Sequence, residues 1–159
     1  PDFHVSGGMS FIQGKYPIIQ AAKDAGEAEE QAKALAGKNA FSFLGEAWKW
    51  SQFSELEKKK EQLKNVITAL NAPLSILQLV QNLDQQRDQA KKKTYGRWLW
   101  MGDYQFTRLI SSKKNDPALQ KSLVELYEQI GKNYYHDVHE WARAARWAQL
   151  ELRKQGKGE

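Results

Sequence analysis

The chain has 159 residues, no cysteine and a formal net charge of +5, with 24 lysine and arginine residues against 19 aspartate and glutamate residues. The lack of cysteine excludes disulfide scaffolds, thiolate zinc sites, iron–sulfur clusters and cysteine nucleophiles. A hydrophobic content of 41% and six tryptophans exclude a disordered chain, and the length corresponds to one domain.

Residues 1–16 are predicted to form an N-terminal arm. They contain three glycines and precede Pro17, a density of helix breakers that is typical of irregular chain. Apolar side chains such as Phe3 and Phe11 predict that the arm packs on the body of the protein or on a partner. The chain starts at Pro1 rather than Met. We therefore expect a processed or excised fragment, and its localisation stays unknown.

Residues 17–159 are predicted to form a single helical domain. Pro17 suits the first position of a helix, and an alanine-rich stretch then favours helix over 17–36. A second helix is predicted over 40–53, where aromatic and apolar residues on all sides indicate a largely buried element.

A long helix is predicted over 54–92. Ser54 and Glu57 match a capping box at its start. Leucines and isoleucines follow at spacings of 7, 4, 3, 4 and 3 from Leu56 to Leu77, which indicates a continuous helical seam. Pro73 interrupts this seam without changing its phase, which favours a kink; the alternative is that Asn71 caps a new helix.

The second long helix is predicted over 117–154. Asp116, Pro117 and Gln120 form a strong start signal, and the apolar spacing that follows stays in phase through Gly131. The helix is predicted to be continuous and bent at this glycine, with a break there as the alternative. Between the two long helices, a short helix is predicted over 103–112.

These elements predict an all-α fold, a mainly antiparallel helical bundle built on the two long helices, with little or no sheet. The stretch 65–83 contains no charged residue and has the length of a membrane span. Its many Asn, Gln, Ser and Thr side chains argue against a stable transmembrane span.

The segment 91–106 is the main candidate for a contact surface, because cations and aromatic rings alternate along it. Interfaces between proteins favour Trp, Tyr and Arg, and single-stranded nucleic acid or another polyanion binds to surfaces with similar mixtures of cations and aromatic rings. Plain packing of a tryptophan-rich turn is the alternative. The predicted partner-binding residues, including two from the arm, are Lys91, Lys92, Lys93, Arg97, Trp98, Trp100, Phe3 and Phe11.

The segment 134–140 contains a weak metal-site candidate. His136 and His139 are three residues apart, and His136 and Glu140 are four apart, so the pairs share a helical face. No further ligand can be named from the sequence, and a solvent-facing polar strip is the preferred interpretation. No motif for a cofactor is found, and none is expected.

The absence of a catalytic motif favours a non-enzymatic protein. A glycan hydrolase remains an alternative, because the fold can bring together two carboxylates that are distant in the sequence. We expect a helical interaction or structural subunit that docks on protein partners within a larger assembly. One alternative is a basic nucleic-acid-binding helical domain, since residues 51–159 carry nineteen cations and thirteen anions. Another is a toxin-like effector domain released from a larger chain.

Overall fold

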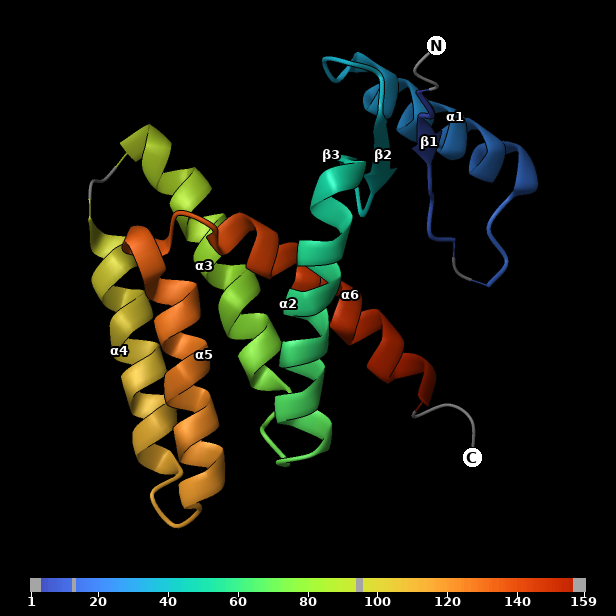
Figure 1. The fold of residues 1–159 in the computed structure, drawn as a ribbon. Helices are drawn as coiled ribbons and strands as arrows, with labels where there is room; N and C mark the ends of the chain where they lie inside the picture. The colour runs from blue at the N-terminus through green and yellow to red at the C-terminus, as the bar shows by residue number, and fades with distance from the viewer. Residues whose placement is uncertain (1–3, 13, 94–95, 156–159) are drawn as a thin grey trace. The chain divides into compact units, whose positions relative to one another are not determined.

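The structure is a computed structural model and describes residues 4–12, 14–93 and 96–155. Its contacts divide the chain into two compact units, Pro1–Glu55 and Leu56–Glu159, so the domain boundary expected after residue 16 stays a prediction. In chain order the described elements (Figure 1) are β1 (Gly7–Gly8), α1 (Ile18–Ala34), β2 (Ala40–Phe43), β3 (Glu46–Lys49), α2 (Trp50–Thr68), α3 (Ser75–Lys93), α4 (Arg97–Ser112), α5 (Pro117–Tyr135) and α6 (Val138–Gln155).

The first unit contains a small sheet, which the sequence analysis did not predict. The strands lie in the order β1-β2-β3, with β1 parallel and β3 antiparallel to β2. Leu44 and Gly45 connect β2 to β3 with φ angles of 55° and 82°, as a two-residue hairpin turn requires. The helix predicted over 40–53 is therefore wrong for 40–49. The apolar residues Phe41, Phe43, Ala47 and Trp48 of β2 and β3 were interpreted as several sides of a buried helix, because a short apolar run does not distinguish a buried strand from a buried helix.

Helix α1 packs on the sheet through the backbone of β1. A Cβ atom added at Gly8 would lie 2.3 Å from the backbone nitrogen of Glu29 and 2.8 Å from Cβ of Ala28. Only glycine permits this close approach. On β2, Ser42 donates a hydrogen bond to Gln31 of α1 at 3.2 Å. This bond links the strand to the helix.

The first part of the arm is fixed to the same unit. The indole Nε1 of Trp50 donates to the carbonyl of Val5 at 2.8 Å, and the Met9 amide donates to the carbonyl of Ser42 at 2.9 Å. The prediction that the arm packs on the body is confirmed for this stretch.

In the second unit, described by itself, α6 packs mainly against α3, while α4 packs against both α3 and α5. Figure 1 shows α4 and α5 side by side, joined by a short turn. Small residues let α6 approach its neighbours closely, since Ala144, Ala145 and Ala148 are fully buried. The fold is mostly helical, which agrees with the coarse prediction.

The prediction of two long helices is not confirmed. The segment 54–92 is divided between α2 and α3, and the segment 117–154 between α5 and α6. Asn71 and Tyr135 adopt φ angles of 54° and 59° at the two breaks, and this left-handed conformation ends a right-handed helix. Gly131 lies inside α5, and the break comes four residues later.

Two helix starts also differ from the predictions. Helix α2 begins at Trp50, ahead of the predicted Ser54, and the side chain of Gln52 accepts a hydrogen bond from the Lys49 amide at 3.0 Å. Helix α4 begins at Arg97, six residues ahead of the predicted Asp103, and its N-cap residue Gly96 is in the left-handed conformation.

The start of α5 is confirmed at Pro117. The Asp116 carboxylate accepts a hydrogen bond from the Leu119 amide at 3.0 Å, which is the capping contact expected from the sequence. Among the described residues, none of the helices is both long and apolar enough to cross a membrane.

Candidate functional site

The exposed face of α4 carries aromatic and cationic side chains. Trp100 and Tyr104 are 57% and 56% exposed, and the exposed Arg97 and Arg108 extend the row at each end. The four residues follow one another at spacings of 3, 4 and 4, which places them on one side of a helix. We call Arg97, Trp100, Tyr104 and Arg108 the α4 aromatic face.

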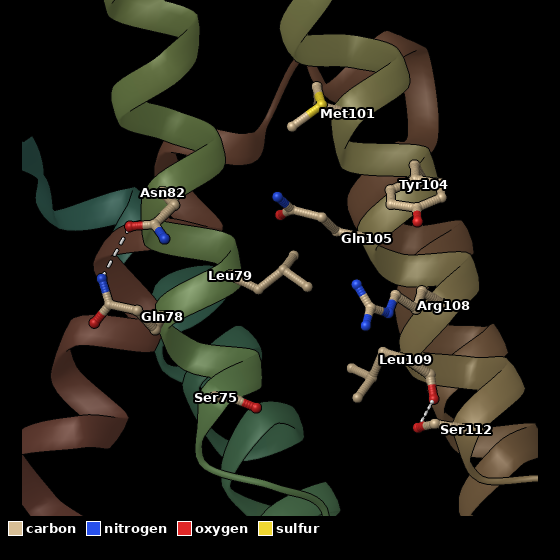
Figure 2. Close-up of a pocket in the computed structure, with 10 residues that line it drawn as sticks. All are labelled: Ser75, Gln78, Leu79, Asn82, Met101, Tyr104, Gln105, Arg108, Leu109 and Ser112. Atoms are coloured by element: carbon tan, nitrogen blue, oxygen red, sulfur yellow. Dashed lines mark hydrogen bonds between the residues drawn. The ribbon is translucent and has the colours of Figure 1, made fainter.

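A groove of about 530 Å³ adjoins this face, between α3 and α4. In Figure 2, Leu79 points into it from α3, and Gln105, Arg108 and Leu109 point into it from α4. Gln78 and Asn82 are joined by a hydrogen bond of 2.9 Å along the α3 side. The groove is lined by Ser75, Gln78, Leu79, Asn82, Met101, Tyr104, Gln105, Arg108, Leu109 and Ser112.

Gly102 permits close contact between α4 and Leu83 of α3. A Cβ atom at this position would lie 2.8 Å from Cδ2 of Leu83, so a larger residue would require the buried Leu83 side chain to shift. Phe106, one turn further along, is completely buried. The inward side of α4 is thus packed, and its aromatic face is left to solvent.

The predicted contact residues of this region fall into three groups. Arg97 and Trp100 belong to the α4 aromatic face. Trp98 points inward and packs edge-to-face on Tyr135, with 6.0 Å between ring centroids. The backbones of Lys91, Lys92 and Lys93 complete α3, but their side chains lie outside the described part of the structure.

Tyr104 lies in the predicted contact segment 91–106 but was not among the residues named there, and Arg108 lies outside that segment. Their signal was present, because they continue the spacing that begins at Arg97 and Trp100. The helix start was placed at Asp103, and the row was therefore cut in two.

The two arm residues predicted to bind a partner belong to the first unit. Phe3 lies outside the described residues. Phe11 is exposed and contacts Phe43 edge-to-face, with 5.5 Å between ring centroids. Further large apolar side chains are exposed along the arm and at the start of α1. We call this sequence-ordered set the exposed apolar strip: Val5, Met9, Phe11, Ile12, Tyr16, Ile18 and Ile19.

The weak metal candidates have separate partners. His136 Nδ1 lies 2.8 Å from the carboxylate of Asp137, and Glu140 forms an ion pair with Lys59 of α2. His139 Nδ1 lies 3.0 Å from the buried Asp84, which also pairs with Arg87 at 2.9 Å. Within the described residues, no group of three or more His, Asp or Glu side chains is arranged to hold a metal ion.

A second polar cluster links α2 to α6. Lys60 donates to Glu151 at 2.9 Å, and Lys64 donates to the other carboxylate oxygen at 3.0 Å. Burial acts to lower the pKa of Lys60, but its bonds to Glu61 and Glu151 outweigh burial and raise that pKa. Lys60 also lies 4.3 Å from the ring centroid of Trp147, so this cation is held by packing as well as by charge.

Comparison of the chain with family models, with curated proteins and with solved structures found no match in any of the three.

Proposed function

We propose that the chain is a non-enzymatic interaction subunit, and that the α4 aromatic face with its groove binds a protein partner. The observation that carries the proposal is the exposure of Trp100 and Tyr104 beside the groove. Burying an aromatic side chain removes roughly 150–250 Å² of surface from water, and Trp, Tyr and Arg dominate the binding energy of protein interfaces.

The lining of the groove favours a protein over a nucleic acid. Arg108 carries the one charge among the ten described residues that line it. A nucleic-acid site needs several cations along a phosphate backbone. Leu79, Met101 and Leu109 supply apolar surface, and the amides of Gln78 and Gln105 supply neutral hydrogen-bonding groups, a mixture that suits an interface between proteins.

The chemistry of the groove indicates the partner's segment. Two neighbouring helices with a partly apolar groove between them accept the apolar side of a third helix. The guanidinium of Arg108 in this groove favours a carboxylate on the incoming helix. The proposed ligand is therefore an amphipathic helix with an acidic residue beside its apolar face.

Site-specific photo-crosslinking tests this proposal. A benzoylphenylalanine in place of Tyr104 is irradiated in an extract of the source cells, with the same group in place of Lys121 on α5 as the control. Lys121 has a side chain that is 80% exposed. The proposal predicts a discrete protein adduct from position 104 alone. An adduct that nuclease destroys would support the nucleic-acid alternative, and identical adducts from both positions would contradict a specific site.

Charge reversal at Arg108 tests the acidic residue of the partner. We expect Arg108→Glu to abolish the adduct and Arg108→Lys to retain part of it, because lysine keeps the charge but loses the bidentate geometry. Lys121→Glu is the matched control and is expected to have no effect. An undiminished adduct with Arg108→Glu would show that the groove does not recognise a carboxylate.

A further inference from the structure

A second pocket, of about 330 Å³, lies between α4 and α5. It is on the side of α4 that carries Asp103, away from the aromatic face. Asp103 and the rings of Tyr127 and Tyr135 line it, with Gly131 on the same wall. Nothing in the protein-binding proposal uses these residues.

The Asp103 carboxylate is held by one of its two oxygens. The hydroxyl groups of Tyr127 and Tyr135 both donate to Oδ1, at 2.9 and 2.7 Å. Burial and the nearby Asp103 raise the pKa of both phenols, so they remain donors at neutral pH. Among the described residues, no donor is found for Oδ2, which stays available to a ligand.

Gly131 leaves part of the pocket empty. A glycine inside a helix is less stable than an alanine, so it calls for a reason. A Cβ atom here would lie 3.8 Å from Tyr135 and 3.9 Å from Tyr127, which are ordinary contact distances. Packing therefore does not require glycine at this position, and a methyl group would occupy space between the two rings.

Tyr135 is held in an unusual backbone conformation. Its φ angle is 59°, a region that bulky residues rarely enter. The end of a helix at such a position normally carries glycine. Here the ring is buried and packs on Trp98, and its hydroxyl reaches Asp103. Strained residues of this kind concentrate at functional sites.

We propose that this pocket binds an organic cation, an ammonium or guanidinium group whose N–H donates to Oδ2 of Asp103 beside the tyrosine rings. Carboxylates and aromatic rings together are the groups that recognise such cations. Glu128 adds a second negative charge at the pocket, against the single positive charge of Lys132. The cation belongs either to a free amine or to a basic side chain of another protein.

Titrations followed by NMR of the ¹⁵N-labelled chain test the site. The probes are n-butylammonium for a free amine, N-acetyl-lysine methylamide for a side chain, and n-butanol as the uncharged control. We expect the cations to shift the amide signals of Asp103 and Gly131, and n-butanol to leave them in place. The tighter-binding cation indicates the source. Equal shifts with n-butanol would overturn the proposal.

Three variants distinguish a cation site from other interpretations. Asp103→Asn keeps an acceptor for both phenols but removes the charge, and is expected to weaken binding by about tenfold. Lys132→Met is expected to strengthen binding by about two- to threefold, because it removes a repelling charge. Loss of binding in Lys132→Met would overturn the proposal, because it would indicate an anion site.

Gly131→Ala is the third variant, with Gly26→Ala as its control. Both replace a helical glycine, and a Cβ at Gly26 meets no atom within 4 Å. We expect Gly131→Ala to weaken binding by about fivefold or more, since the methyl group occupies the part of the pocket between the two tyrosine rings, and Gly26→Ala to leave it unchanged. Equal binding in the two variants would show that the space at Gly131 serves no ligand.

Discussion

Gly8 shows how a single residue fixes the packing of the first unit. The strand that contains it has two residues, yet it lies directly against the backbone of α1. Neighbouring Gly7 has the same residue type and a different environment, because a Cβ added there would meet no atom within 4 Å. Substitutions at the two glycines therefore form a matched pair, which measures how much the close contact between β1 and α1 contributes to stability.

Gly8→Ala is expected to lower the free energy of unfolding by about 1–3 kcal/mol, because α1 and β1 must move apart to admit the methyl group. Gly7→Ala should change it by less than about 0.5 kcal/mol. Urea unfolding followed by circular dichroism measures both. Equal stability of the two variants would contradict the close packing of β1 on α1.

At the scale of elements, α2 and α6 are linked through Glu151. Burial acts to raise the pKa of this carboxyl, but hydrogen bonds from Lys60 and Lys64 outweigh burial and lower it. A carboxyl whose pKa is lower in the folded state stabilises the fold above its ordinary value, and the contribution is lost as pH falls through the folded-state value.

We therefore expect the free energy of unfolding to decrease as pH falls from about 5 to 3, below the ordinary glutamate value of about 4.3. Glu151→Gln should show a shallower decrease and, at pH 7, a stability lower by about 1–3 kcal/mol, because Lys60 loses a partner. Glu125→Gln, at an exposed position, is the control. An unchanged pH slope in Glu151→Gln would contradict this role for the cluster.

The start of α1 extends the exposed apolar strip of the first unit. Ile18 and Ile19 are 83% and 84% exposed, and exposed apolar side chains bind hydrophobic dyes and other proteins. We expect the double substitution Ile18→Ser, Ile19→Ser to reduce the fluorescence of bound anilinonaphthalene sulfonate at least about twofold with stability unchanged within about 0.5 kcal/mol. Undiminished fluorescence would contradict the prediction, because it would show that the dye binds at a surface without Ile18 and Ile19.

The boundaries of a helix could be predicted where neighbouring residues in the sequence determine them. Asp116 and Pro117 mark the start of α5 by their own chemistry, and the structure confirms it. The breaks at Asn71 and Tyr135 come from left-handed residues. A seam that stays in phase across such a break gives no warning of it, and tertiary packing decides whether the helix continues.

The candidate site was predictable in part for the same reason. Arg97 and Trp100 were selected for their residue types, which needs no knowledge of the fold. Tyr104 and Arg108 required the correct start of α4. The pocket around Asp103 depends on Tyr127 and Tyr135, which are 24 and 32 residues away; no local pattern joins them to Asp103.

At the scale of the whole molecule, the chain presents an exposed surface in each of its two units. The apolar strip is in the first unit, and the α4 aromatic face with its groove is in the second. A net charge of +5 is compatible with many kinds of partner. The proposed function therefore rests on where the aromatic residues are exposed and not on the overall charge.

The most direct test is the dissociation constant of the protein captured at position 104, measured with the chain and with its Trp100→Ala, Tyr104→Ala double variant. We expect the double variant to bind with an affinity lower by about 100-fold or more, and to unfold like the unaltered chain because both side chains are exposed. The control Lys121→Ala should bind like the unaltered chain. A double variant that binds within about twofold of the unaltered chain would contradict the assignment of the α4 aromatic face as the binding surface.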